Sequence, residues 1–256
     1  AAEAGFNVLL LDGDDGYHIG MAKKASGSKD MLFSEAARKR INVVRLVDSP
    51  SNHKFTDFLV EFFRAKGEFF FNENTSKFYR TKPTGIGEVL AIDPTKLTTN
   101  DVVIIDSWTA LVQSMKLKYS TQNGIDLADA AKTDWPGYGW MGNLSTEIVR
   151  MMHSMPCHIV IIGHEQVYEK YQGTGNDRRL VEQRTQVQTT SGPASRSFGK
   201  DFSDILTFNI KSSGTEISTK SSATTEGGSR LIPPDTFIFN NPQTGASDTP
   251  KTNFTF

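Results

Sequence analysis

Cysteine is almost absent from this sequence of 256 residues, in which Cys157 is the only one. A single cysteine excludes an internal disulfide and any metal site built from several cysteines. No apolar run approaches the length that spans a membrane, and the N-terminal residues lack the charged-then-apolar pattern of a signal peptide. These absences predict a soluble, cytoplasmic protein without a membrane partner.

A surplus of charge is also missing, because 28 basic residues face 29 acidic ones. No overall basic field therefore points to nucleic acid, although a local basic patch would be enough for binding. The phosphate-binding motif Gly-x-x-x-x-Gly-Lys-Ser/Thr does not occur in the sequence either. Residues 192–200 resemble it superficially, but their glycines are too far apart and Asp201 follows the lysine.

Apolar runs bounded by turn residues predict strands that are buried on both faces, as in a parallel sheet. The strong runs are residues 6–12, 41–47, 101–106 and 157–163, with shorter candidates at 205–210 and 237–239 and within 67–93. Helical spacing predicts helices at 55–65, ended by Gly67, and at 141–155, stopped by Pro156. This alternation predicts an α/β fold with a largely parallel sheet flanked by helices.

We expect one domain over residues 1–240, with a short C-terminal β extension, followed by a flexible tail over 241–256. The first five residues read as the last turn of a helix that Gly5 closes. Residues 16–30 read as an irregular excursion. Residues 172–200 read as a long polar loop, which in a compact domain is functional or disordered.

Polar side chains follow the predicted strands at Asp12 to Asp15, Asp48, Asp106-Ser107 and His164-Glu165. Ligands of open α/β sheets bind outside the carboxyl ends of the strands. A carboxylate such as Asp106 suits a nucleotide-bound Mg²⁺, which prefers oxygen ligands and keeps most of its waters. An aspartate in this place also serves as a turn or helix-cap residue. Taken alone, Asp106 supports the two interpretations equally.

The order of these motifs resembles the RecA/RadA family of recombinase ATPases. Residues 102–111 (Val-Val-Ile-Ile-Asp-Ser-Trp-Thr-Ala-Leu) are similar to the family's magnesium strand, and 189–195 to the end of its second DNA-binding loop. Residues 162–165 and 199–206 look like the compact RecA-fold ATPases that phages encode for single-strand annealing and recombination. The likeness spans most of residues 1–210 through short motifs, and it implies a RecA-like fold.

The resemblance implies ATP and Mg²⁺ as cofactors. Asp106 would hold the Mg²⁺, with Ser107 beside it in the nucleotide site. Asp14 falls where the family places the carboxylate that orients the attacking water. The family usually has glutamate there, so Asp12 or Asp15 could take this role instead.

The resemblance also implies a γ-phosphate sensor at His164, for which a structural hydrogen bond is an equally good interpretation. Lys200 would reach the nucleotide of a neighbouring subunit, as expected of a homo-oligomer that forms a ring or a filament. In the family, the helix after the phosphate loop runs directly into the strand that begins here at Phe6. We therefore expect the missing loop just upstream of Ala1.

Two mobile loops face the DNA in RecA-like proteins, and by chain order they fall at residues 116–140 and 166–197. Basic residues interleaved with aromatic ones are typical of a surface that binds single-stranded nucleic acid. The first loop offers Lys116, Lys118, Trp135 and Tyr138, although nearby acids support a solvated loop equally well. The second offers Lys170, Arg178, Arg179, Arg184 and Arg196.

Together these patterns predict an Mg-ATP-hydrolysing, RecA-like protein that binds single-stranded DNA in recombination, annealing or replication. If it is of phage type, it acts in the cytoplasm of a bacterial host, and a single-strand DNA-binding protein is a further expected partner. Two alternatives stay open. One is a RecA-fold ATPase that acts on protein, and the other is a DNA-binding or assembly module that does not hydrolyse ATP.

Overall fold

The computed structural model describes most of the chain up to residue 189 and short segments beyond it. The described residues are 1–17, 34–50, 52–125, 135–174, 177–189, 198, 200, 202, 204–211, 214–218, 228–229 and 236–240. Most of the predicted excursion at 16–30 and the whole predicted tail at 241–256 lie outside them. The chain divides into two compact units, 1–164 with 189–191 and 165–188 with 192–256.

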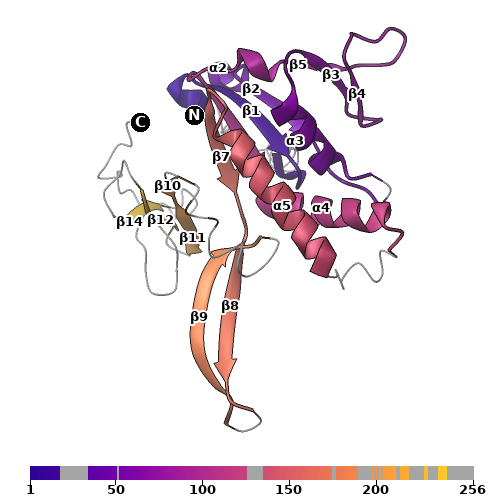
Figure 1. Ribbon diagram of the computed structural model, residues 1–256. Helices are drawn as coiled ribbons and strands as arrows, with labels where there is room; N and C mark the ends of the chain where they lie inside the picture. The colour runs from indigo at the N-terminus through magenta and orange to yellow at the C-terminus, as the bar shows by residue number, and fades with distance from the viewer. Residues whose placement is uncertain are drawn as a thin grey trace, which may run out of the picture. The chain divides into compact units, whose positions relative to one another are not determined.

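The first unit is built on a parallel sheet of four strands in the order β2-β1-β6-β7 (Figure 1). Every neighbouring pair in it is parallel. The strands are β1 (Asn7–Asp12), β2 (Ile41–Arg45), β6 (Asp101–Asp106) and β7 (His158–Ile162). They coincide with the four strong apolar runs, and the predicted α/β fold with a parallel sheet is confirmed.

Burial differs between the two central strands of the sheet and the edge strand β7. In the central strands, Leu11, Val103 and Ile105 are completely buried. In β7, Val160 and Ile162 remain 44% and 42% exposed. The prediction that β7 is buried on both faces is therefore wrong, because residues 158, 160 and 162 share one face of the strand and all three are exposed.

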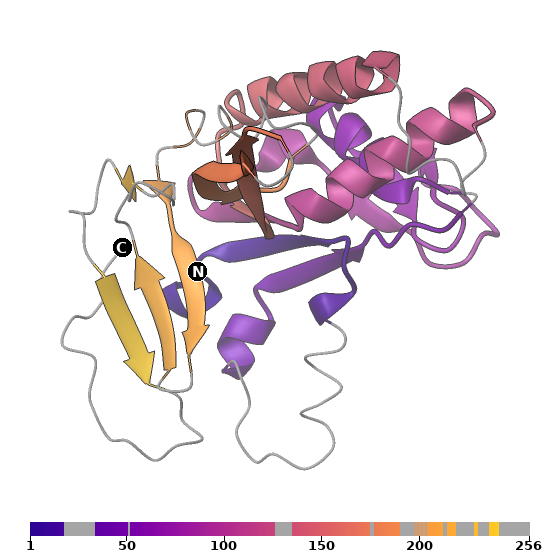
Figure 2. The same ribbon diagram turned by 90° about the horizontal axis from the view of Figure 1, so that it is seen from below.

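Helices cover both faces of the sheet (Figures 1 and 2). The long helices α3 (Lys54–Arg64), α4 (Trp108–Gln122) and α5 (Trp135–Met152) lie on one face and contact one another. The short helix α2 (Glu35–Arg38) and the 3-10 turn η1 (Ala2–Ala4) lie on the other. Gly5 closes η1 with a left-handed φ of 95°, as the sequence predicts for the end of a helical turn.

A phenylalanine core joins α3 to a second, antiparallel sheet in the order β4-β3-β5. Its strands are β3 (Phe69–Asn72), β4 (Lys77–Tyr79) and β5 (Leu90–Ile92), and the 3-10 turn η2 (Pro94–Lys96) follows. The ring of Phe58 in α3 lies 5.0 Å from that of Phe71 and 6.0 Å from that of Phe69, measured between centroids. All three rings are fully buried, and each contributes roughly 1.5–3 kcal/mol through burial. The short strands expected within residues 67–93 are thereby confirmed.

The boundaries of both predicted helices differ from the prediction, and α5 ends at Met152 instead of residue 155. Helix α3 ends at Arg64, before Gly67. Helix α5 begins at Trp135 instead of residue 141, with Pro136 in its first turn, where a helix needs no N–H from proline. Lys116 and Lys118 lie in α4. The prediction of a loop over residues 116–140 is therefore wrong at both ends, since helices occupy them.

The second unit contains a two-stranded antiparallel ribbon of β8 (Glu165–Gln172) and β9 (Arg179–Val187). Within the predicted loop over residues 166–197, residues 166–172 and 179–187 are thus paired strand. The later strands are β10 (Asp204–Ile205), β11 (Thr207–Lys211), β12 (Gly214–Ser218), β13 (Gly228–Ser229) and β14 (Thr236–Asn240). Strands β11, β12 and β14 form an antiparallel sheet, and β10 pairs with β13.

In the part of the chain that the structure describes, no helix has the length and apolar character needed to cross a membrane.

A buried polar network joins α3 to α4. The Ser114 hydroxyl oxygen accepts hydrogen bonds from the Thr56 backbone N–H at 2.9 Å and from the Thr56 hydroxyl at 2.8 Å. The Asp48 carboxylate accepts the Phe55 backbone N–H at 2.9 Å. Burial raises the pKa of Asp48, and its hydrogen bonds with Ser114 and Phe55 act in the opposite direction. The strand-end Asp48 therefore has a structural role at the start of α3.

We expect Ser114→Ala to lower the free energy of unfolding by about 1–3 kcal/mol, because it removes the acceptor of two buried donors. Chemical denaturation of the variant and the wild type measures the difference. The matched control is Ser154→Ala, since Ser154 is exposed and donates only to the Met151 carbonyl. The control should stay within about 0.5 kcal/mol of wild type. Equal destabilisation in both variants would contradict a structural role for the buried network.

Candidate functional site

The register of the parallel sheet brings three strand ends to the same level. Asp12 pairs with Asp106, and Asp106 pairs with Ile162. Asp14 and His164 each follow two residues beyond their strand end, and His164 Nε2 lies 3.9 Å from Asp14 Oδ2. The structure thus gathers Asp14, Asp106 and His164 at the carboxyl edge, where open α/β sheets bind ligands.

Asp12 has a structural role in this edge. Its side chain is completely buried. Its two carboxylate oxygens accept the backbone N–H groups of Gly16 at 3.2 Å and Tyr17 at 3.1 Å. These charge-assisted hydrogen bonds stabilise the buried carboxylate and shape the turn that follows β1.

Asp15 forms an ion pair with Arg45 of the neighbouring strand β2. The Nε and Nη2 atoms of Arg45, at the end of β2, each lie 2.7 Å from its carboxylate oxygens. Two parallel N–H···O hydrogen bonds between a guanidinium and a carboxylate make a strong and geometrically specific ion pair. Of the three acids in the loop, Asp14 has the side chain that lies near His164, and it is 35% exposed. The geometry therefore favours Asp14 over Asp12 and Asp15 for a role in the site.

Gly13 allows the acidic loop to approach the end of β6 closely. Its backbone N–H donates to the Asp106 carbonyl at 2.6 Å. A Cβ atom on Gly13 would lie only 2.3 Å from the ring of Phe55, which is 1% exposed and has no room to move. Any side chain at this position would therefore push the loop away from Asp106.

Asp106 carries a carboxylate that the fold does not neutralise. No hydrogen bond or ion pair joins this carboxylate to another residue that the structure describes. Burial raises the pKa of Asp106, and the neighbouring charges of Asp14 and then Asp12 raise it further, while His164 acts in the opposite direction. A cation bound at this edge would relieve the penalty on the ionised form.

Ser107 is fully buried and begins α4. Its hydroxyl oxygen accepts the Ala110 backbone N–H at 3.1 Å, which is the geometry of a helix N-cap. The Asp106–Ser107 peptide bond is cis. The structure thus gives Ser107 a capping role at the position where the sequence places a nucleotide contact.

His164 has an exposed ring and an anchored backbone. Its side chain is 61% exposed, whereas its backbone N–H donates to the Thr109 hydroxyl at 3.1 Å. Sequence reasoning did not identify Thr109, because nothing in the sequence links it to a residue so far along the chain. For Gly13, the sequence showed only that it belongs to an Asp-Gly-Asp loop and did not show its close approach to Phe55.

The residues at this edge fit a Mg²⁺ ion that is held mainly by its nucleotide. The described part of the chain contains no group of three or more His, Cys, Asp or Glu residues arranged for a metal. Mg²⁺ commonly takes one or two protein carboxylates and completes its shell with phosphate oxygens and water. Asp106, with its unneutralised charge, meets that requirement.

The other predicted binding residues of the first unit lie on α4 and α5. Lys118 is engaged in an ion pair with Asp57 at 2.6 Å and is only 18% exposed. Lys116 is partly buried in the same helix. In the first turn of α5, Trp135 is 89% exposed and Tyr138 is 40% exposed. The two aromatic residues remain available to a ligand, whereas Lys118 is already neutralised.

The ribbon of the second unit has two chemically different faces. Directly paired residues of an antiparallel ladder share a face, and alternate residues along a strand do so too. The register therefore places Tyr168, Lys170 and Arg179 on one face, which also carries Glu182 opposite Lys170 and which we term the basic face. Val167, Tyr171 and Leu180 lie on the other, with exposed fractions of 41–54%.

Four predicted residues of the second unit remain, namely Arg178, Arg184, Arg196 and Lys200. Arg178, in its turn, lies over the Tyr171 ring at 4.1 Å from the centroid. Arg184 is the register partner of Tyr168. Lys200 is exposed, and Arg196 lies outside the described residues.

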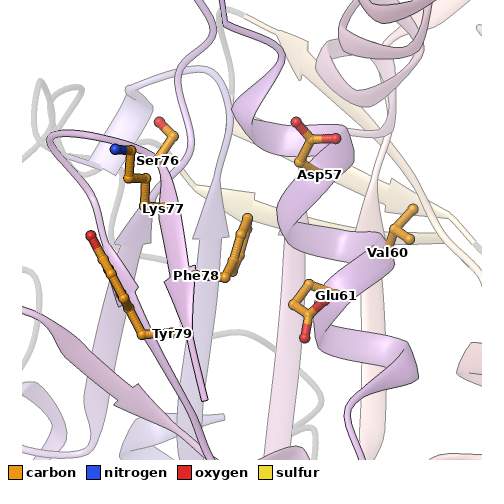
Figure 3. Close-up of a pocket in the computed structure, with 7 residues that line it drawn as sticks. All are labelled: Asp57, Val60, Glu61, Ser76, Lys77, Phe78 and Tyr79. Carbon is orange, nitrogen blue, oxygen red and sulfur yellow. The ribbon is translucent and has the colours of Figure 1, made fainter. Parts of the chain in front are cut away.

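A shallow hollow of about 520 Å³ lies between α3 and β4 (Figure 3). Its lining residues are Asp57, Val60, Glu61, Ser76, Lys77, Phe78 and Tyr79. Its carboxylates already form ion pairs, Asp57 with Lys118 and Glu61 with Arg80. None of the predicted site residues lines it, and the strand-end carboxylates are the better candidate for chemistry.

The chain belongs to the AAA domain family, because the family model for an AAA domain matches residues 21–231 of the 256. This family is part of the P-loop NTPase superfamily, whose members bind nucleotides, and AAA domains in general work as ATPases. The match agrees with a parallel sheet flanked by helices. No curated protein and no solved structure matches the chain at a significant level.

We expect Asp106→Asn to raise the thermal unfolding midpoint at neutral pH by a few degrees. The raised pKa means that folding disfavours ionised Asp106, so the wild type is stabilised below the unfolded-state pKa and loses this stability as the pH rises through the folded-state pKa. Asparagine cannot ionise and escapes that destabilisation. The midpoints of the variant and the wild type should therefore converge in acid and separate as the pH rises.

The control for this measurement is Asp93→Asn, at the N-cap of η2, where Thr95 and Lys96 lower the pKa of the carboxyl. Its stability difference from wild type should have the opposite sign at neutral pH. If Asp106→Asn were the less stable protein at neutral pH, the charge of Asp106 would be compensated in the fold.

Proposed function

We propose that this AAA-family chain binds and hydrolyses Mg-ATP and couples hydrolysis to the binding of single-stranded DNA in recombination, annealing or replication. The observation that carries the proposal is the convergence of Asp14, Asp106 and His164 at the carboxyl edge of one parallel sheet. The motifs that resemble phage RecA-fold ATPases favour a protein of phage type. The acting form would be a homo-oligomer, for which Lys200 is a candidate to reach a neighbouring subunit's nucleotide.

Each residue at the edge has a proposed role in hydrolysis. Asp106 holds the Mg²⁺, which when bound neutralises charge on the phosphate oxygens. Asp14 accepts a hydrogen bond from the attacking water and aligns it with the γ-phosphate. His164, next to Asp14, contacts the γ-phosphate oxygens. Positioning and electrostatics of this kind supply most of the catalysis in phosphoryl transfer.

The basic face of the ribbon supports the DNA part of the proposal. Lys170 and Arg179 on this face are exposed, as residues that bind phosphate must be. Tyr168, two residues before Lys170 on the same face, offers a ring on which a base could stack. On α5, exposed Trp135 and Tyr138 are further candidates for stacking. Since such residues recognise the DNA backbone and the faces of the bases, the binding should be tolerant of DNA sequence.

Two other functions compete with this one. The face of the ribbon that carries Val167, Tyr171 and Leu180 would also suit a protein partner, which favours an ATPase that acts on protein. The sequence contains no Gly-x-x-x-x-Gly-Lys-Ser/Thr segment, so a module that does not hydrolyse ATP is the second alternative. ATP binding is therefore measured first, then turnover, and finally turnover with DNA.

We expect Asp106→Asn to reduce ATP turnover by about 10²-fold or more while it weakens ATP binding much less, because the charge acts mainly on the transition state. Turnover of Mg-ATP and equilibrium binding of a fluorescent ATP analogue give the two numbers. The matched control is Asp101→Asn, at the opposite end of the same strand. Absence of ATP binding in the wild type would contradict the proposal, and unchanged turnover in Asp106→Asn would remove this residue from the site.

We expect the double variant Lys170→Gln/Arg179→Gln to bind single-stranded DNA more weakly for all base sequences. The slope of log affinity against log salt should fall by about 0.7 for each DNA phosphate that the variant no longer neutralises. Fluorescence anisotropy with labelled oligonucleotides at several salt concentrations measures both effects.

The charge-matched control for DNA binding is Lys39→Gln/Lys96→Gln, which removes two lysines that are each 75% exposed on the first unit. It should leave the salt slope unchanged. Equal effects in the two double variants would mean that the ribbon is no specific DNA surface. If single-stranded DNA neither bound in a salt-dependent way nor stimulated turnover, the protein-directed alternative would stand.

A further inference from the structure

The backbone N–H of His164 lies just beyond the paired part of β7. The register between β6 and β7 ends where Asp106 pairs with Ile162. The hydroxyl oxygen of Thr109 accepts the His164 N–H at 3.1 Å. The first backbone N–H beyond the paired residues of β7 for which a partner is known thus bonds to a side chain of α4 and not to a neighbouring strand. This hydrogen bond fixes the chain where it leaves β7.

Thr109 is well placed for this hydrogen bond because it lies in the first turn of α4. The N-cap of the helix is already formed by Ser107, whose hydroxyl accepts the Ala110 N–H. The Thr109 hydroxyl is therefore not needed as a cap, and its partner lies outside the helix. Three functions fall on one short segment: Asp106 presents its carboxylate, Ser107 caps α4, and Thr109 anchors His164.

We propose that Thr109 is a positioning residue of the nucleotide site, which keeps His164 beside Asp14. This inference rests on the proposed function for the role of His164 in hydrolysis. The acidic loop has separate anchors, namely the hydrogen bonds of Asp12 and that of the Gly13 N–H with the Asp106 carbonyl. Removal of the Thr109 hydroxyl therefore releases His164 and leaves Asp14 and Asp106 in place.

The test compares Thr109→Val, which has the same shape without a hydroxyl, with Thr109→Ser, which keeps the hydroxyl. In Thr109→Val, the His164 amide should exchange with deuterium about tenfold faster, the effect of removing one net hydrogen bond. The kcat for ATP should fall by a similar factor while KM stays close to wild type. Thr109→Ser should restore both values. The matched control is Thr146→Val, since the Thr146 hydroxyl bonds only to the Gly142 carbonyl of its own helix.

The outcomes separate this inference from the proposed function. A Thr109→Val protein with an unchanged His164 amide and unchanged kcat would overturn the role of Thr109, and so would a serine variant no better than valine. If the wild type shows no ATP turnover, the proposed function fails, and the amide exchange alone decides about Thr109. Faster exchange confined to His164 and its neighbours, and reversed by serine, would then support the anchor.

Discussion

The parallel pairing of β1, β6 and β7 in one register places Asp12, Asp106 and Ile162 side by side. Parallel pairing sends the carboxyl end of every strand to the same edge, so residues from distant parts of the chain meet there. A slip of one residue in β6 would turn Asp106 to the opposite face of the sheet. The candidate site therefore depends on this register before it depends on any single side chain.

The loops that follow these strands continue the pattern of the sheet for one more hydrogen bond. The Gly13 N–H donates to the Asp106 carbonyl, and the Leu46 N–H donates to the Asp12 carbonyl at 2.7 Å. These hydrogen bonds keep the acidic loop close to its neighbours before it turns away. They explain why a small residue is needed at Gly13, where the ring of Phe55 fills the remaining space.

The strands of the parallel sheet and helix α3 were predictable from the sequence, because burial leaves a hydrophobic pattern, whereas α4 was not predicted over its whole length. The run at residues 101–106 became β6, and the phenylalanine stripe became α3. The ribbon was not predictable in this way. Glu165–Gln172 and Arg179–Val187 are mostly polar and face solvent, so their composition is that of a loop, and only cross-strand pairing makes them strands.

The site was predictable as a set of strand-end residues, but its internal hydrogen bonds and ion pairs were not. Asp14, Asp106 and His164 could be named from their positions after apolar runs. The ion pair between Arg45 and Asp15 spans 30 residues, and the hydrogen bond between Thr109 and His164 spans 55. No local pattern reports interactions at such separations. The choice among the three acids of the loop therefore had to wait for the tertiary structure.

The four carboxylates at the edge, those of Asp12, Asp14, Asp15 and Asp106, differ in the partners that stabilise their negative charge. This difference bears on the function of Asp106. Asp12 is stabilised by two backbone N–H groups and Asp15 by the ion pair with Arg45. A helix-cap role for Asp106 was the competing interpretation of the sequence, but Ser107 performs that capping instead. Asp106 is left half-buried near like charges, with a raised pKa. Groups held in an unfavourable charge state concentrate at functional sites, and a bound cation is the ligand that would remove the penalty.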